Sequence, residues 1–140
     1  MISSPASKTY VAFGAVIIWF SILLQFYVSL QQANFHFIET LKLFLSFFTV
    51  TTNILLGFCL LSLWLAKEKN LGVFFPKSST LTALTVYILV VGLIYNVLLR
   101  GLLHPTGWAR IADELLHVAS PLIFLGFWIF FVDKTKLAYK

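Results

Sequence analysis

The sequence predicts an all-α fold, a polytopic membrane helix bundle with four transmembrane helices in a single domain over residues 1–140. Apolar residues make up 60% of the chain and charged residues 11%, whereas soluble domains contain roughly 25% charged residues. The mean hydropathy is +0.95. The apolar residues form runs of about 20, the length that a helix needs to cross a bilayer, and the short alternating strands of a membrane barrel are not visible.

Four spans are predicted, separated by short polar segments. They cover approximately residues 10–30, 44–66, 81–101 and 114–132. The first run follows Lys8, so a secretory signal peptide is an alternative for it. The run is longer than the roughly 7 to 15 residues of a signal-peptide core and lacks a small-residue cleavage site, which favours a retained helix. Residues 31–40 are expected to form a loop, and a second loop is expected to include Gly107, Trp108 and Arg110.

The distribution of basic residues predicts the orientation. One side of the membrane holds the N-terminus, the loop between the second and third spans, and the C-terminus. Basic residues are enriched in cytoplasmic segments, so we expect a multi-pass protein of the cell membrane with both termini in the cytoplasm. That side carries Lys8, Lys67, Lys69, Lys77, Lys134, Lys136 and Lys140, and the opposite side carries Lys42, Arg100 and Arg110.

Nucleic acid, metal ions and cofactors are not expected as partners. The net charge of +5 is spread over loops and the C-terminal tail without a basic run, which argues against nucleic-acid binding. Cys59 is the one cysteine, so neither a disulfide nor a thiolate metal site can form within the chain. His36, His104 and His117 show no metal-binding spacing. Only the last two are expected to be close enough for haem to be an alternative.

Polar residues inside the spans are predicted to gather at the outer end of the bundle. The second and fourth spans begin at that end and the third span ends there, because consecutive spans alternate in direction. Hydrocarbon tolerates a polar side chain only when it meets a partner, so we expect these residues to line one outward-opening pocket. They are Thr49, Asn53, Tyr95, Asn96, Arg100, Asp113, Glu114, His117 and Ser120.

Their spacing indicates one polar face on each helix, because polar or small residues recur every four positions. Gly57 and Gly92 on these faces would let neighbouring helices approach closely. Pro121 lacks an amide hydrogen, so the carbonyl of His117 loses its helical partner and the fourth helix is expected to kink there. The three series are Thr49-Asn53-Gly57, Gly92-Asn96-Arg100 and Asp113-His117-Pro121.

A threonine and a histidine brought together inside a membrane predict a nucleophile and a general base. An alcohol is a weak nucleophile at neutral pH, and an imidazole that takes its proton contributes typically about 10²–10⁴ in rate. Thr49 would be the nucleophile and His117 the base. The residues expected to bind substrate, stabilise an oxyanion or orient the base are Asn53, Tyr95, Asn96, Arg100, Asp113 and Ser120.

The same polar residues also have structural interpretations. The threonines at positions 51–52 are expected to bond to their own backbone or to a neighbouring helix. Asn53 and Asn96 could bond to each other and fix the register of two helices. Arg100 could extend to the membrane interface or pair with Asp113.

Three short segments contain most of these residues. They are Phe47-Phe48-Thr49-Val50-Thr51-Thr52-Asn53, Gly92-Leu93-Ile94-Tyr95-Asn96 with Leu99-Arg100, and Ala112-Asp113-Glu114-Leu115-Leu116-His117 with Pro121. Together they resemble the bacterial branch of the androgen-induced membrane protein superfamily. Animal members of that superfamily are multi-span hydrolases of fatty acid esters of hydroxy fatty acids, with an intramembrane threonine nucleophile and a histidine.

The resemblance implies that Thr49 is the nucleophile, that His117 is the histidine, and that the substrate is a fatty acyl ester. Members of that family usually continue for further spans, so this chain is expected to be a fragment or a shortened relative of a six-span protein. The resemblance extends over nearly the whole chain.

Two classes of function are therefore considered. The first is an integral membrane hydrolase of a lipid ester. The second is a noncatalytic membrane protein, either a bundle that binds a lipid or small molecule or a subunit of a membrane complex. Membrane lipid is the expected partner in both cases, and a homo-oligomer is compatible with both. A transporter would need oligomerisation at this size, and no broken-helix repeat supports one.

Overall fold

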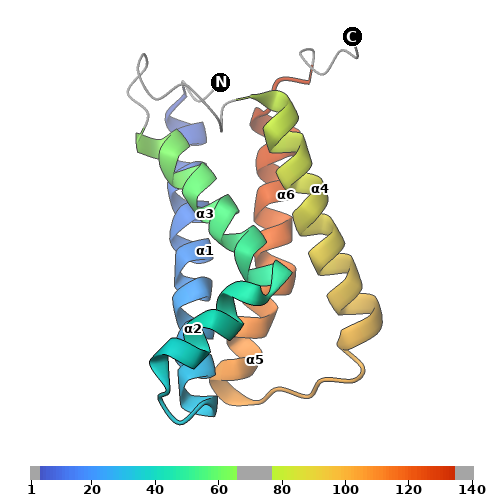
Figure 1. Ribbon diagram of the computed structural model, residues 1–140. Helices are drawn as coiled ribbons and strands as arrows, with labels where there is room; N and C mark the ends of the chain where they lie inside the picture. The colour runs from blue at the N-terminus through green and yellow to red at the C-terminus, as the bar shows by residue number, and fades with distance from the viewer. Residues whose placement is uncertain (1–3, 66–76, 135–140) are drawn as a thin grey trace.

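The computed structural model describes residues 4–65 and 77–134, in which every regular element is a helix (Figure 1). Four helical stretches of this part are long and apolar enough to span a membrane. The predicted all-helical class and four-helix membrane bundle are therefore confirmed. The elements are α1 (Pro5–Gln32), α2 (Phe37–Ser46), α3 (Phe48–Leu65), α4 (Ser78–Ile94), the π-helical η1 (Tyr95–Leu99), α5 (Gly107–Glu114), the π-helical η2 (Leu115–Ala119) and α6 (Ser120–Phe131).

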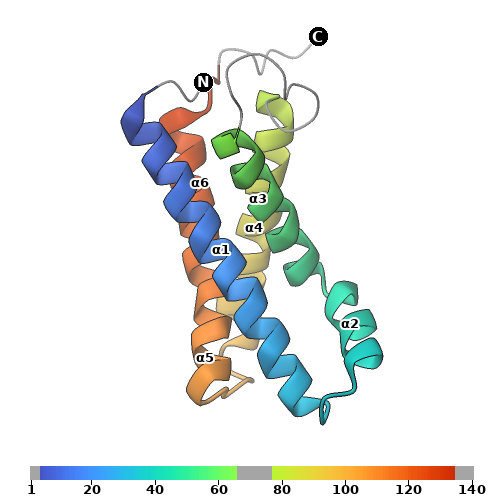
Figure 2. The ribbon, with the colours of Figure 1, turned by 90° about the vertical axis from the view of Figure 1, so that its left-hand side faces the viewer.

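The helix α1 has clear signals at both ends. Pro5 occupies its first turn, and the Oγ atom of Ser4 caps it by accepting a hydrogen bond from the amide of Ser7 at 3.1 Å. After Gln32 the chain reverses through Asn34 and Phe35, which both have positive φ angles. This reversal directs α2 back along the end of α1 (Figure 2).

The helix α2 replaces part of a predicted loop, so the loop prediction for residues 37–40 is wrong. Phe44 is buried, and its ring lies 5.1 Å from the ring of Phe26 on α1. Charged Glu39 and Lys42 alternate with apolar residues at helical spacing, which makes α2 amphipathic. A run of apolar residues does not reveal this helical spacing. It also continues from the end of α2 into α3, so the two helices read as one span. The second span therefore begins at Phe48 rather than at residue 44.

The fourth span also begins earlier than its predicted start at residue 114. Gly107, Trp108 and Arg110 belong to the first turns of α5, so their assignment to a loop is wrong. Charged residues in α5 interrupt the apolar run without interrupting the helix, because helical residues at the membrane surface remain in contact with water. The third span ends at Leu99.

Some predictions fall outside the described residues. Four lysines that support the predicted orientation lie there, as does residue 66, the predicted end of the second span. These lysines are Lys67, Lys69, Lys136 and Lys140.

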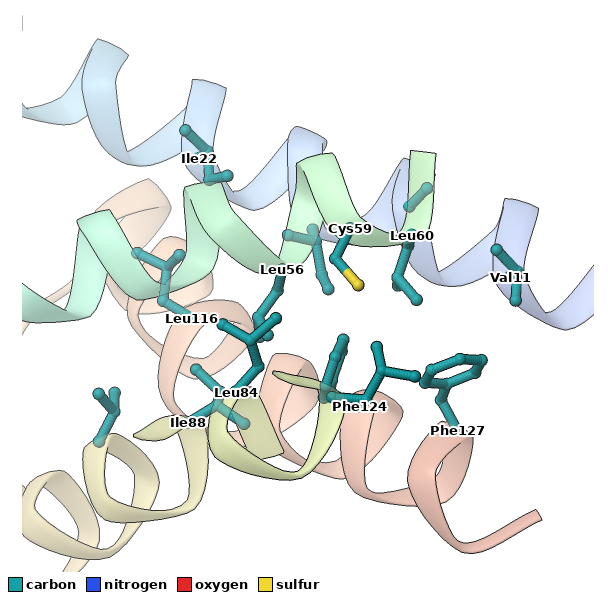
Figure 3. Packing of buried hydrophobic residues seen from close by; sticks show 14 of the residues in the cluster. Val11, Ile22, Leu56, Cys59, Leu60, Leu84, Ile88, Leu116, Phe124 and Phe127 are labelled. Atoms are coloured by element: carbon teal, nitrogen blue, oxygen red, sulfur yellow. The ribbon is translucent and has the colours of Figure 1, made fainter. Parts of the chain in front are cut away.

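Buried apolar side chains from all four spans fill the middle of the bundle. Figure 3 shows Leu56 and Leu60 of α3 on one side of this core, with Phe124 and Phe127 of α6 and Ile88 of α4 opposite. All five are fully buried. Lipid tails are as apolar as these side chains, so close packing contributes more than exclusion of water to holding the helices together.

Gly92 lets α4 approach η2 closely. A Cβ atom at this position would lie 3.1 Å from the backbone oxygen of His117 and 3.1 Å from Cγ of Pro121. Gly57 of α3 has a similar place, since a Cβ atom there would lie 3.0 Å from Nε1 of Trp19 on α1. The close helix approach predicted at both glycines is confirmed.

The substitution Gly92→Val is expected to destabilise the bundle by about 1–3 kcal/mol, because a backbone carbonyl and a proline ring cannot turn away from the added side chain. The measurement is the midpoint of thermal unfolding of the purified protein in detergent. Gly101→Val is the matched control, because a Cβ atom at that position would have no atom of the described residues within 4 Å apart from its own chain neighbours. Equal midpoints for the two variants would contradict the close approach at Gly92.

Candidate functional site

Polar side chains from three spans meet at one end of the bundle, which we call the polar end. The helices α3 and α5 begin at this end and η1 ends there (Figures 1 and 2). The first turn of α1 and the last turn of α6 lie at the opposite end. The alternating direction of the spans thus brings the polar segments to one level, as the sequence predicts.

The fourth span is π-helical where it carries His117. The amide of Ser120 bonds to the carbonyl of Leu115, five residues back, so the carbonyl of Leu116 loses its α-helical donor. Pro121 has no amide hydrogen to offer the carbonyl of His117. The distortion predicted beside Pro121 is therefore a π-helical turn that leaves two carbonyl groups in need of other donors.

Asn53 of α3 supplies a donor to one of these carbonyls. Its Nδ2 atom donates to the oxygen of Leu116 at 3.5 Å and to the oxygen of Thr49, one turn earlier on α3, at 2.9 Å. The side chain is fully buried. Asn53 thereby ties the first turn of α3, which carries Thr49, to the turn that carries His117.

Asn96 of η1 supplies a donor to the other carbonyl. Its Nδ2 atom donates to the oxygen of His117 at 3.3 Å and to the oxygen of Gly92 at 2.7 Å. The alternative in which Asn53 and Asn96 bond to each other is wrong, because each amide group donates to η2 and to its own helix. Neither amide is therefore a free donor for an oxyanion in this structure.

Arg100 connects η1 to α5. Its Nη1 atom donates to Oδ1 of Asn96 at 2.6 Å, and its Nη2 atom forms an ion pair with Glu114. The alternative in which Arg100 pairs with Asp113 is wrong, because the Asp113 carboxylate has other partners. Both members of the observed ion pair are partly exposed, so the pair lies at the rim of the polar end.

Tyr95, Asp113 and His117 form a three-residue cluster, which we call the histidine cluster. Nδ1 of His117 lies 3.1 Å from Oδ1 of Asp113 and 2.9 Å from its backbone oxygen. The hydroxyl of Tyr95 donates to Oδ2 of Asp113, and the Tyr95 ring stacks on the imidazole with 4.0 Å between ring centroids. Since Nδ1 faces two acceptor oxygens, the proton of a neutral imidazole belongs on Nδ1, which leaves Nε2 as the acceptor.

Thr49 lies half-buried in the first turn of α3. Within the described residues, its hydroxyl makes no hydrogen bond to His117. A helical threonine usually bonds to the carbonyl four residues back, which here belongs to Leu45. That carbonyl instead accepts a hydrogen bond from Oγ1 of Thr51 at 3.1 Å, because the chain breaks between α2 and α3 at Phe47. The predicted backbone bond of Thr51 is confirmed.

Ser120 is fully buried, and its hydroxyl has no partner among the residues that the structure describes. It lies three positions after His117, at the start of α6. Oδ1 of Asn53 is also buried without a partner in the described ranges. Both atoms are therefore buried polar groups without a partner among the described residues, close to the contact between α3 and η2.

Two pockets open at the polar end and share the loop of residues 103–105 and Asp113. The larger has a volume of about 710 Å³ and lies among the ends of α1, α2 and α5. The smaller has a volume of about 270 Å³ and is lined by Tyr95, Arg100 and Glu114 among others. The sequence analysis missed the larger pocket, although Gln25 and Ser29 follow one another at helical spacing near the end of the first span.

No protein-family model, curated protein or solved structure matches the chain. What the site can do therefore follows from its geometry and chemistry.

The substitution Tyr95→Phe is expected to destabilise the protein by about 1 kcal/mol, because it removes the donor that the partly buried Asp113 carboxylate receives from η1. Thermal unfolding in detergent measures the effect. Tyr87→Phe is the matched control, since the Tyr87 ring packs on Phe48 and its hydroxyl makes no hydrogen bond within the described chain. A loss of similar size in both variants would show that the Tyr95 hydroxyl contributes nothing specific.

Proposed function

We propose that this chain is an integral membrane hydrolase that cleaves a fatty acyl ester, with Thr49 as nucleophile and His117 as general base. The observation that carries the proposal is the histidine cluster. Nδ1 of its imidazole is bound by Asp113, and Nε2 remains an acceptor. A general base that removes the proton of an alcohol needs this arrangement. The resemblance of the three polar segments to the bacterial branch of the androgen-induced membrane protein superfamily supports the same assignment.

In the proposed reaction, Nε2 of His117 takes the proton of the Thr49 hydroxyl while Oγ1 attacks the ester carbonyl carbon. The Asp113 carboxylate stabilises the imidazolium that forms. The imidazolium then gives its proton to the departing alkoxide, which leaves as an alcohol. Water, deprotonated by the same imidazole, then attacks the carbonyl carbon of the acyl-threonine ester. The bond between this carbon and Oγ1 of Thr49 breaks, the fatty acid is released, and Oγ1 takes the proton back from the imidazolium. Of the predicted oxyanion and substrate-binding groups, the Ser120 hydroxyl is the one that remains uncommitted.

The proposal requires Oγ1 of Thr49 to reach Nε2 of His117 when substrate is bound. Catalytic hydrogen bonds are often long in substrate-free enzymes and shorten in the complex. Asn53 supports this approach because its amide binds the carbonyl groups of both Thr49 and Leu116. The side chain of Asn53 therefore holds the turn that carries Thr49 beside the turn that carries His117.

A second candidate is a noncatalytic bundle that binds a lipid or small molecule. The larger pocket favours it, because neither Thr49 nor His117 lines that pocket. The two candidates predict different results for the same pair of substitutions. A hydrolase loses turnover without Thr49 or His117, whereas a binding protein has no turnover to lose.

We also propose that the chain lies in the cell membrane with both termini in the cytoplasm, which places the polar end on the outer side. The excess of lysine on the side of the termini supports this orientation. Substrate would then reach the histidine cluster from the outer leaflet.

The substitutions Thr49→Ala and His117→Ala are each expected to lower ester hydrolysis by about 10²–10⁴-fold, because each removes one half of the nucleophile and base pair. The assay follows release of fatty acid from a fatty acid ester of a hydroxy fatty acid by the protein in nanodiscs. Thr51→Ala is the matched control, since the Thr51 hydroxyl is bound to the backbone carbonyls of Leu45 on α2 and of Phe47 between α2 and α3. Labelling of Thr49 by a fluorophosphonate probe should also be lost in both variants.

Equal hydrolysis by the wild type and the three variants would reject the assigned pair. Absence of hydrolysis in the wild type, together with binding of the ester, would favour the noncatalytic candidate.

The orientation predicts which single cysteines react with a membrane-impermeant maleimide in intact cells. In a Cys59→Ser background, cysteines at Lys42 and His104 should react, and cysteines at Lys8 and Lys134 should react only after the cells are opened. All four positions are exposed in the structure. The reverse pattern would place the polar end in the cytoplasm.

A further inference from the structure

The larger pocket at the polar end has the composition of an amphiphile site. Its volume of about 710 Å³ lies within the usual 300–1,000 Å³ of small-molecule sites. One part of its lining is apolar and includes Val28, Leu43 and Phe44. The other part is polar and includes Gln25 and Ser29 of α1. Such a division suits a ligand with one apolar and one polar end.

The position of the pocket agrees with this division. It lies where α1 ends and α2 begins, beside the start of α5, so it is at the end of the spans, where lipid headgroups meet the hydrocarbon (Figure 2). A ligand with its polar end in the pocket would have its chain directed along the bundle toward the membrane interior.

The charged residues of the pocket determine which kind of ligand headgroup it favours. Two carboxylates line it, Glu39 of α2 and Asp113 of α5, together with the imidazole of His104, and no lysine or arginine of the described residues does. Asp113 is engaged by Tyr95 and His117. Glu39 makes no ion pair within the described residues, so its carboxylate is available to a ligand.

The nearest basic residue on the same helix does not enter the pocket. Lys42, three residues after Glu39 on α2, is exposed and does not line it. The remaining polar lining includes the amides of Gln25 and Gln32, whose oxygen atoms can accept hydrogen bonds from an ammonium group. Phe44 and Phe47 add aromatic rings to the wall, and such rings attract cations.

We propose that this pocket binds a long-chain amphiphile with a protonated amine headgroup, which Glu39 recognises. An anionic headgroup such as a carboxylate or phosphate would face the Glu39 carboxylate without a lysine or arginine among the described lining residues. A hydroxyl headgroup could donate a hydrogen bond to Glu39 but would lack the attraction between opposite charges that an ammonium group gains. This site is independent of whether Thr49 and His117 act on an ester.

The test uses three photoreactive probes that share a hexadecyl chain with a diazirine near its middle and differ in headgroup: primary amine, alcohol or carboxylate. The full chain in zwitterionic nanodiscs is irradiated with each probe, and labelled peptides are identified by mass spectrometry. Labelling of the α6 peptide, which does not line the pocket, corrects for partition into the bilayer. We expect the amine probe to label residues 25–47 about tenfold more than the carboxylate probe, and the alcohol probe to fall between them.

Variants at Glu39 separate recognition of the charge from general affinity for membrane amphiphiles. Glu39→Gln should reduce labelling by the amine probe to the level of the alcohol probe, and Glu39→Lys should reverse the order of amine and carboxylate. Glu39 is exposed, so both variants are expected to fold, which elution as a single species on size exclusion checks. Asp133→Asn is the matched control, because it removes a carboxylate at the opposite end of the bundle.

Equal labelling by the three probes would overturn the proposal, as would an amine preference that survives Glu39→Gln. Labelling of residues 25–47 and α5 by the amine probe that does not exceed its labelling of the α6 peptide would overturn it as well, whatever the variants do. None of these readouts depends on hydrolysis, so a failed esterase assay leaves the test intact.

Discussion

The contacts among the spans at the polar end depend on two carbonyl groups that the fourth span cannot satisfy by itself. The π-helical turn and Pro121 deprive the carbonyls of Leu116 and His117 of their α-helical donors. A buried carbonyl without a donor costs several kcal/mol in hydrocarbon. Asn53 and Asn96 supply the missing donors from the second and third spans, and in doing so they fix both spans against the turn that carries His117.

This constraint explains how the polar side chains are held together at one end of an otherwise apolar bundle. Apolar packing does little to select one arrangement of membrane helices, because lipid and protein interior are equally apolar. Hydrogen bonds to unsatisfied carbonyls do select one. The close contact at Gly92 then allows Asn96 to reach His117, and the adjacent Tyr95 covers the imidazole with its ring. The orientation of the histidine is therefore a result of how the backbone of its own helix is satisfied.

The sequence predicted the parts of the structure that follow from length and direction. Four apolar runs require four spans, and their alternation brings Asn53, Asn96 and His117 to one end. Two features did not follow. Asp113 and Glu114 are adjacent, and neighbouring helical residues point about 100° apart, so only packing decides which carboxylate faces Arg100. The boundary at Phe47 was also hidden, because this apolar residue continues the hydropathy run while its backbone is extended.

That hidden boundary bears directly on the proposed nucleophile. In a continuous helix the Thr49 hydroxyl would bond to the carbonyl of Leu45, as threonines in membrane helices usually do. Because the chain turns at Phe47, Thr51 takes that carbonyl instead. Thr49 consequently keeps its hydroxyl free of its own backbone at the start of α3, while Asn53 holds its main chain beside the turn that carries His117. The break between α2 and α3 thus separates Thr51, whose hydroxyl is bound to the backbone, from Thr49, the nucleophile that we propose.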